Sequence, residues 1–571
     1  MRATEEKNRL MATTLSPPET LTAAPSYTHG AGAVPLLGVT IGDAFLTTAR
    51  RVPDVEALVS RQEGIRLTYA QLAVEVDRCA RGLIAAGLEH GDRLGIWAPN
   101  RHEWVVLQFG AARVGVILVN INPAYRVTEL GYALRQSGVR GLVLSPTYRG
   151  SDYRDMLADC DPPASLRTVV VLDDAAREGQ MGWSRLLSMG DTVDDHTLAE
   201  RAAACQPDDA INIQYTSGTT GAPKGATLSH HNILNNGYFI GETLRYTEDD
   251  RVCVPVPFYH CFGMVIGNLA SITHGCTTVI PGEVFDPLAV LEAVQEERCT
   301  SLYGVPTMFI AELDHPRFAE FDLSSLRTGV MAGSPCPVET MKRCVRDMHM
   351  TGVTICYGMT ETSPVSTQSE LSDSVERRCS TVGRVHPHVE IKLVDPATGR
   401  TVGRGEPGEL CTRGYSVMLG YWDNEEATRG AIDAARWMHT GDLGVMDADG
   451  YLNIVGRIKD MVIRGGENVY PREVEEFLHT HPAISEAQVV GVPDPRYGEE
   501  LCACVRLRPG ASLAADEVRG FCRGKIAHHK VPRHVVVVEE FPMTVTGKVQ
   551  KYLLRERMIA ELGLEGAAPT A

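Results

Sequence analysis

The order of its secondary-structure signals constrains this chain most, because strands alternate with helices through most of its length. Residues 93–98 have the short apolar pattern of a strand, 103–114 the periodicity of a helix and 116–120 the pattern of a second strand. A strand, helix, strand order joins parallel strands of one sheet. The same alternation predicts further strands at 141–145, 168–172, 251–255, 276–280 and 353–357. The sequence therefore predicts an α/β protein.

The pattern changes twice towards the C-terminus. After about Gly383, short strand signals separated by glycines, at 390–394, 408–412 and 451–454, predict a small β subdomain. Beyond Arg457 a new unit begins, in which Pro471 suits a first helical turn and strands are expected at 487–492 and 501–507. We expect a large N-terminal domain of layered α/β subdomains plus a small β subdomain, followed by a small α+β C-terminal domain. A chain of 571 residues is also longer than one hydrophobic core usually supports.

The predicted boundaries divide the chain into four parts: a disordered tail over 1–38, an N-terminal domain over 39–457, a C-terminal domain over 458–558 and a tail over 559–571. The first 37 residues mix charged, hydroxylated, Pro and Ala residues without an apolar segment, which argues against a secretory signal. Apolar runs stay far below the roughly 20 residues that span a bilayer, so no integral membrane association is expected.

Charge and cysteine usage exclude other classes. The net charge of −17 opposes binding to phosphate backbones, so nucleic acid is not an expected partner. Fifteen cysteines occur without a C-x-x-C pair, which indicates neither a zinc framework nor a disulfide scaffold. A reducing, cytoplasmic location is predicted.

One loop has the composition of a phosphate-binding site. It consists of Thr216, Ser217, Gly218, Thr219, Thr220, Gly221, Ala222, Pro223 and Lys224. Its glycines free the backbone to turn N–H groups towards a phosphate, the hydroxyls add donors and the lysine adds charge. Pro223 and Gly225 stand where the NTPase P-loop needs Gly and Ser or Thr. A plain flexible loop is the alternative to a polyphosphate cradle.

This loop closely resembles the signature of the adenylate-forming superfamily, which includes acyl-CoA synthetases, aryl-CoA ligases, firefly luciferase and peptide-synthetase adenylation domains. The resemblance runs from about Leu67 to Lys551, and the other motifs of the family follow in their expected order. The segments 230–232 and 361–364 are most similar to medium-chain and related fatty acyl-CoA synthetases.

The resemblance implies a nucleotide site. In the family pattern the ring of Tyr357 packs on adenine, Thr360 touches the α-phosphate and Glu361 helps hold Mg²⁺, a cation that prefers oxygen ligands. Asp442 would accept hydrogen bonds from the ribose hydroxyls, and Arg457 would reach the nucleotide. The remaining nucleotide-contacting positions implied are Gly333, Ser334, Pro335 and Gly358.

It also implies substrate and domain-motion residues. His260 would lie beside the substrate carboxylate, and Lys548 would be the lysine of the adenylation step. Lys459 would be the hinge of a mobile C-terminal domain. That motion would bring Gly465, Gly466 and Asn468 into the site during thioester formation.

The predicted function is ATP-dependent activation of a fatty or related carboxylic acid to acyl-AMP, followed by transfer to CoA. The cofactors and co-substrates implied are ATP, Mg²⁺ and CoA, and the partner is a small-molecule carboxylic acid. Residues 258–260 carry no acid, which disfavours amino acid substrates. Two related alternatives are an aryl-CoA ligase and an acyl-AMP ligase that loads a carrier protein, although the compact 364–383 stretch shows no restraining insertion. A non-catalytic nucleotide-binding scaffold would be expected to lack Lys548 or Glu361.

Overall fold

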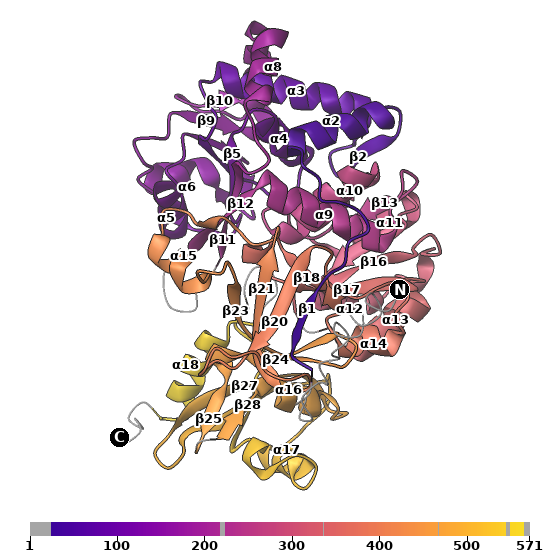
Figure 1. The fold of residues 1–571 in the computed structure, drawn as a ribbon, viewed down its shortest axis with the longest axis vertical. Helices are drawn as coiled ribbons and strands as arrows, with labels where there is room; N and C mark the ends of the chain where they lie inside the picture. Colours follow the sequence, from indigo (N-terminus) through magenta and orange to yellow (C-terminus); the bar gives the residue numbers. More distant parts are fainter. Residues whose placement is uncertain (1–23, 217–222, 335, 466, 544–548, 565–571) are drawn as a thin grey trace, which may run out of the picture.

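The computed structural model describes residues 24–216, 223–334, 336–465, 467–543 and 549–564. Two large sheets with their helices form the upper part of the molecule in Figure 1, a five-stranded sheet follows, and the C-terminal domain lies at the lower end. The α/β class with a small C-terminal domain is confirmed.

The first large sheet has eight strands. Its order is β10 (Met181–Gly182), β9 (Thr168–Val171), β6 (Gly141–Leu144), β4 (Arg93–Trp97), β5 (Ile117–Asn120), β11 (Ala210–Thr216), β12 (Lys224–Ser229) and β22 (Gly420–Tyr421). The strands from β10 to β11 are parallel. The last two pairings, β11 with β12 and β12 with β22, are antiparallel.

The second large sheet has nine strands. Its order is β19 (Arg384–Val385), β18 (Val365–Gln368), β17 (Gly352–Gly358), β16 (Thr328–Ala332), β15 (Ser301–Gly304), β13 (Arg251–Cys253), β14 (Thr277–Ile280), β2 (Glu56–Ser60) and β3 (Ile65–Thr68). Its six central strands are parallel, as the alternation of strands and helices predicted.

Helices between the two large sheets form the main core. The helix α4 (His102–Arg113) is buried along almost its whole length, and α9 (His230–Leu244) is buried on most sides. Both contribute to one hydrophobic cluster with strands of both sheets, including β4 and β13. A helix that is buried on most sides needs such a site between two layers. A capping box formed by Ser229 and Asn232 fixes the start of α9.

The other helices cover the outer faces of the large sheets or connect strands. They are α2 (Ile41–Arg51), α3 (Tyr69–Ala85), α5 (Val127–Ser137), α6 (Tyr153–Asp159), α7 (Trp183–Met189), α8 (Asp195–Ala203), α10 (Ala270–His274), α11 (Pro287–Glu296), α12 (Pro306–Leu313), α13 (Val338–Asp347), α14 (Val375–Ser380) and α15 (Glu425–Ala431). Separate apolar clusters lie beneath α11 to α13 and beneath α5 and α6.

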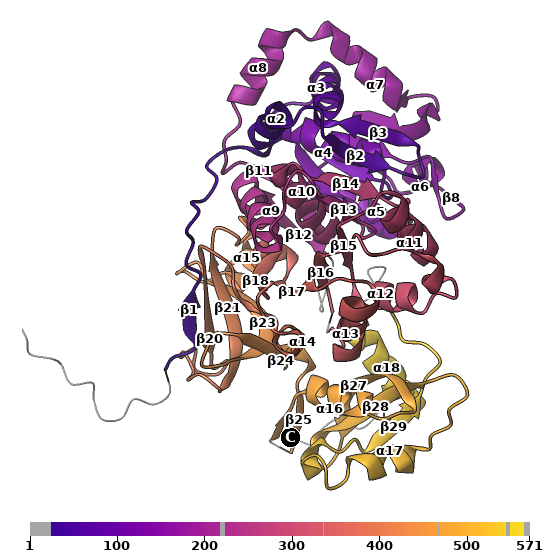
Figure 2. The ribbon, with the colours of Figure 1, turned by 90° about the vertical axis from the view of Figure 1, so that its right-hand side faces the viewer.

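The predicted β subdomain is a five-stranded antiparallel sheet. Its order is β1 (Tyr27–His29), β20 (Val389–Val394), β21 (Pro407–Gly414), β23 (Met438–Met446) and β24 (Leu452–Arg457). Figure 2 shows β1 along the outer edge of this sheet, beside β20.

The predicted disordered tail over 1–38 is wrong for residues 24–38. Strand β1 pairs with β20, and its Tyr27 hydroxyl donates to Glu390 at 2.9 Å. Gly30 passes so close to the β subdomain that a Cβ there would lie 1.8 Å from the His386 carbonyl oxygen. Further on, the Leu37 N–H donates to Asn235 Oδ1 of α9 at 2.7 Å. The segment gains its order from these distant partners, so its local composition did not reveal it.

The C-terminal domain contains a second five-stranded sheet, in which β26 (Glu467–Val469), β25 (Val462–Arg464), β28 (Gly498–Leu507) and β27 (Ile484–Asp494) follow one another and β29 (His534–Val537) pairs with β28. Helices α16 (Pro471–His479) and α17 (Ala515–Cys522) cover one face, and α18 (Lys551–Glu561) covers the other. Pro471 stands at the start of α16, as predicted. The helix α18 continues through the boundary predicted at residue 558, which corrects the start of the C-terminal tail.

Candidate active site

Residues from three sheets meet around a short helix, η5 (Thr360–Thr362), which follows β17. Thr216 ends β11 of the eight-stranded sheet, Tyr357 lies near the end of β17, and Asp442 lies on β23 of the β subdomain. The contacts described below join these three sheets through side chains. Ligands of open α/β sheets bind outside the carboxyl ends of the strands, and this convergence has that position.

Glu361, the predicted metal ligand, is held by hydroxyl groups. Its side chain is buried, and its Oε1 accepts from Thr216 Oγ1 at 3.1 Å and from the Tyr421 hydroxyl at 2.9 Å. Met418 N–H donates to the Glu361 carbonyl oxygen at 2.9 Å. Burial, together with the charge of Glu361, raises the pKa of Tyr421, so this hydroxyl stays a donor.

Lys224 contacts the same tyrosine, Tyr421, that donates to this carboxylate. Its ammonium nitrogen is 5.1 Å from the centre of the Tyr421 ring, a cation–π distance, and its carbonyl oxygen accepts from Thr216 Oγ1 at 3.4 Å. The antiparallel register pairs Thr216 with Lys224 across β11 and β12. The structure therefore places the first and last residues of the predicted phosphate loop opposite each other beside Glu361. Residues 217–222 lie outside the described part of the chain.

A second carboxylate, that of Asp442, links the five-stranded sheet to the nine-stranded sheet. Its Oδ2 accepts from the Tyr357 hydroxyl at 2.7 Å, and its Oδ1 accepts from Arg457 Nε at 3.0 Å. Asp442 and Arg457 are register partners on β23 and β24. Burial and the Asp442 charge raise the pKa of Tyr357 well above its ordinary value, and the same charge raises the pKa of Arg457. The three predicted nucleotide residues thus form one hydrogen-bonded group.

The chain needs glycine where β17 approaches η5. A Cβ on Gly358 would lie 1.8 Å from the Pro364 carbonyl oxygen, closer than any side chain can come. Because glycine has no Cβ, the backbone after Tyr357 can pass this close to Pro364, which follows η5.

His260 lies at the entrance of a π-helical segment, η3 (Phe262–Leu269), between the large sheets. Its Nδ1 accepts from the Phe262 N–H at 3.2 Å. The adjacent Cys261 brings this segment to η5, because its sulfur lies 3.8 Å from Thr360 Oγ1. The structure therefore places His260 and Thr360, both predicted catalytic residues, on touching segments.

The remaining predicted positions are distributed as follows. Gly333 follows β16 with φ +94°, a left-handed conformation that favours glycine, and Ser334 comes next. Gly465 and Asn468 lie on the β25–β26 hairpin of the C-terminal domain, where Gly465 N–H donates to the Tyr497 carbonyl oxygen at 2.8 Å. Pro335, Gly466 and Lys548 lie outside the described residues.

Sequence reasoning missed two residues that hold the site. Tyr421 was not singled out, although it donates to Glu361. Asn100 was also missed: its Oδ1 accepts from the Phe258 N–H at 2.8 Å, and its Nδ2 donates to the Val256 carbonyl oxygen at 3.0 Å. This buried amide ties the start of α4 to the segment that carries His260. A lone Asn or Tyr carries no motif, so only tertiary contacts identify them.

The oxygen atoms at and around Glu361 are of the kind that bind a hard cation. Carboxylate and hydroxyl oxygens are ligands that Mg²⁺ accepts. Within the part of the chain that the structure describes, no Lys, Arg or His forms an ion pair with this buried carboxylate. Glu361 is therefore the buried carboxylate of this site that could hold a metal ion.

Comparison with known proteins agrees with this geometry. Residues 45–422 match the model of the AMP-binding enzyme family, and residues 473–548 match that of the AMP-binding enzyme C-terminal domain. The putative acyl-CoA synthetase YngI of Bacillus subtilis (strain 168) is 47% identical, with 93% of this chain and 99% of that protein covered. The mitochondrial medium-chain acyl-CoA ligase ACSF2 of Danio rerio is 46% identical, with 96% and 93% covered.

A solved structure shares the architecture. The crystal structure of ATP-bound MatB from Rhodopseudomonas palustris superposes with a TM-score of 0.77 at 30% identity, covering 90% of this chain and 98% of that one. Each of the two family models matches its own domain of this chain. The relatives are similar over nearly their whole length, and they lead to the same assignment. The chain belongs to the AMP-binding enzyme family.

Proposed function

We propose that this enzyme is an acyl-CoA synthetase for medium-chain fatty acids and related carboxylic acids, which it activates with ATP to acyl-AMP and then transfers to CoA. The observation that carries the proposal is the arrangement at the end of β17. Tyr357 is bonded to Asp442, and Glu361 is held between Thr216 and Tyr421. The segment 357–361 would thereby present a ring and a carboxylate suited to a metal ion, and Asp442 on β23 would supply the ribose acceptor beside the ring.

The first step is attack of the substrate carboxylate on the α-phosphorus of ATP, with pyrophosphate as the leaving group. Such a reaction requires positioning and charge stabilisation rather than a protein nucleophile. Lys224, beside Glu361, supplies positive charge near the phosphates, and Asp442 with Tyr357 orients the nucleoside. Mg²⁺, held at Glu361, would neutralise phosphate charge when bound.

In the second step the CoA thiolate attacks the carbonyl carbon of acyl-AMP, and AMP leaves. His260, on the segment that Cys261 joins to Thr360, would contact the carboxylate and later the thioester carbonyl. The cysteines need no role, since neither half-reaction uses a protein thiol.

The choice of acid is supported by two observations. The ACSF2 relative is named a medium-chain acyl-CoA ligase. In this chain the segment after His260 is a buried π-helix, Phe262–Leu269, in which Asn268 is the only polar side chain, and this composition suits an alkyl chain rather than a charged substrate.

The test is a panel of saturated acids from four to sixteen carbons, with benzoate and malonate, scored for pyrophosphate and for acyl-CoA. We expect the highest kcat/KM for acids of about six to twelve carbons, and thioester only when CoA is present. A preference for benzoate would favour an aryl-CoA ligase. Pyrophosphate release without thioester, even with CoA, would favour an acyl-AMP ligase that loads a carrier protein.

We also propose a cytoplasmic location. All fifteen cysteines are free thiols, most of them buried, which suits a reducing compartment. The structure contains, among its described residues, no helix of the length and apolar character required to cross a membrane. Fractionation of the source cells with an antibody to the protein tests the location, and recovery with an organelle or membrane fraction would contradict it.

A further inference from the structure

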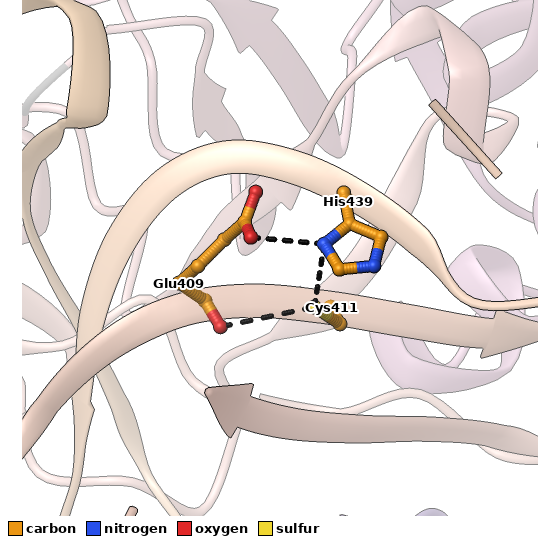
Figure 3. Close-up of side chains that lie close together, drawn as sticks. All are labelled: Glu409, Cys411 and His439. Carbon is orange, nitrogen blue, oxygen red and sulfur yellow. Dashed lines mark hydrogen bonds and ion pairs between the residues drawn. The ribbon is translucent and has the colours of Figure 1, made fainter. Parts of the chain in front are cut away.

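Three side chains with metal-binding atoms gather on the β subdomain, apart from Glu361 and Asp442. Glu409 and Cys411 lie two residues apart on β21, and His439 is the cross-strand partner of Cys411 on β23. Figure 3 shows the three side chains converging between the two strands. His439 Nδ1 is 2.9 Å from Glu409 Oε2 and 3.5 Å from Cys411 Sγ.

These distances suit a small cation. The three ligand atoms all lie within 4.8 Å of one another. Around a tetrahedral Zn²⁺ with bonds of about 2.0 to 2.3 Å, neighbouring ligand atoms are roughly 3.3 to 3.7 Å apart. Small side-chain rotations would therefore open the present contacts enough to admit the ion.

The outer contacts resemble those that orient metal ligands. Glu409 Oε1 accepts from the Gly441 N–H at 3.2 Å, which leaves Oε2 towards the cluster. Asp433 Oδ1 accepts from two backbone N–H groups, those of Ala435 at 2.9 Å and Trp437 at 2.8 Å. Its other oxygen, Oδ2, lies 3.8 Å from His439 Nε2. A carboxylate behind the second ring nitrogen of a histidine is the usual support of a histidine ligand.

Charge and exposure fit as well. One carboxylate and one thiolate would balance a dication, with neutral imidazole as the third ligand. Cys411 is fully buried, while the His439 side chain is 34% exposed. An ion can therefore enter from the His439 side and keep water as its fourth ligand, as zinc sites with three protein ligands do.

A second group of similar residues is not free to bind a metal ion in the same way. Glu63, His102 and Glu103 also lie close together, but the Arg101 guanidinium is 3.0 Å from Glu103 and 3.3 Å from Glu63. A cation already occupies that group, so a metal ion would have to displace it.

We propose that Glu409 Oε2, Cys411 Sγ and His439 Nδ1 bind one zinc-like divalent cation, with a water in the open position. On binding, the Cys411 thiol loses its proton to solvent, and the imidazole carries its single proton on Nε2, facing Asp433. No oxidation or reduction takes place. The site lies on the strand that carries Asp442 but uses none of the predicted nucleotide residues.

Cobalt is the probe, because a thiolate bound to Co²⁺ gives a charge-transfer band in the near ultraviolet. The full-length, untagged, reduced protein is stripped of metal with a chelator and titrated with Co²⁺, then with Zn²⁺. We expect the band to saturate near one equivalent and to disappear as Zn²⁺ displaces Co²⁺. Cys411→Ser should abolish the band and weaken binding at least a hundredfold. The matched control Cys379→Ser, at another free cysteine, should leave both unchanged.

Two further variants make the test independent of the buried cysteine. His439→Gln, at a partly exposed position, should weaken Co²⁺ binding at least tenfold even if Cys411→Ser does not fold. Asp433→Asn should retain the band but weaken binding about tenfold, the usual effect of removing an outer partner. Absence of a thiolate band in the wild-type protein at stoichiometric Co²⁺ would overturn the proposal. A band that survives Cys411→Ser or His439→Gln would also overturn it.

Discussion

At the scale of single residues, the candidate active site contains two carboxylates that have different hydrogen-bond partners. Hydroxyl groups hold Glu361, whereas Asp442 is bonded to a tyrosine and to Arg457. The Arg457 side chain is 58% exposed, whereas Asp442 is buried. The two hydrogen bonds to Asp442 fix the orientation of its carboxylate. Glu361, which has no ion-pair partner among the described residues, is the carboxylate that we propose as the metal ligand.

Glu361→Gln should raise the magnesium concentration needed for half-maximal adenylate formation at least tenfold, because a hard dication loses an anionic oxygen ligand. Pyrophosphate release is measured across a magnesium titration at saturating ATP and acid. The matched control is Tyr421→Phe, which removes one hydrogen bond to the same oxygen but keeps the charge, and it should shift the midpoint less. An unchanged midpoint in Glu361→Gln would remove Glu361 from the metal site.

Lys548→Ala should slow adenylation about a hundredfold to a thousandfold, the usual cost of losing one preorganised charged group at a transition state. Its thioester formation from supplied acyl-AMP and CoA should stay near the wild-type rate, since the lysine is expected to act only in the first step. Each half-reaction is measured separately. Lys525→Ala, at an exposed lysine of the same domain, is the control. An equal loss in both half-reactions would contradict this division.

At the level of elements, the sequence predicted what local periodicity specifies. The predicted strand, helix and strand over 93–120 match β4, α4 and β5 within one or two residues, because buried strands and an apolar helix have clear patterns. Strand β1 was missed because it is only three residues long, too short to show such a pattern, and because it forms only by pairing with β20. Tyr421, and the pairing of Cys411 with His439 across 28 residues, also depend on strand register. The spacing of residues within a short stretch of sequence does not predict which residues of two strands will lie opposite each other.

The helix α12 carries an element-scale prediction about pH. Glu312 is fully buried, and within the described structure neither carboxyl oxygen has a hydrogen-bond partner. Burial raises its pKa well above the ordinary value. The folded state thus keeps a proton that the unfolded chain loses, so stability falls as pH rises from about 4.5 to the folded pKa.

Glu312→Gln removes this titration. The free energy of unfolding of the variant minus that of the wild type should increase with pH, by about 1.4 kcal/mol per unit, until the folded pKa is passed. Urea unfolding at pH 5, 6, 7 and 8 measures it. Glu320→Gln, at an exposed carboxylate nearby, is the control variant. A difference for Glu312→Gln that does not change with pH would show that the Glu312 carboxyl is ionised or solvated in the folded protein.

At the scale of the whole molecule, the two domains are joined by a very short connection. Strand β24 ends at Arg457 and β25 begins at Val462, with one turn of helix over Ile458–Asp460 between them. Any reorientation of the C-terminal domain must therefore occur through a few backbone torsions. Lys459, the predicted hinge, lies in this turn.

Lys459→Pro should leave one half-reaction near its wild-type rate and slow the other at least tenfold, because proline fixes φ near −65° and removes the backbone N–H. Lys459→Ala, which keeps the torsion free, should support both. The two half-reactions are measured with ATP plus acid and with acyl-AMP plus CoA. If the proline variant performs both at normal rates, the rotation does not take place at this residue.

Strand β1 has a consequence for biosynthesis. Tyr27 leaves the ribosome early, but its partner Glu390 lies 363 residues later in the chain. At translation rates of about 5 to 20 residues per second, roughly 20 to 70 s pass before that partner is made. During this interval the edge of the β subdomain does not exist, and Leu37 must also wait for Asn235. The N-terminal domain can close only after the ribosome has passed the β subdomain, so the nascent chain must avoid other strand partners until then.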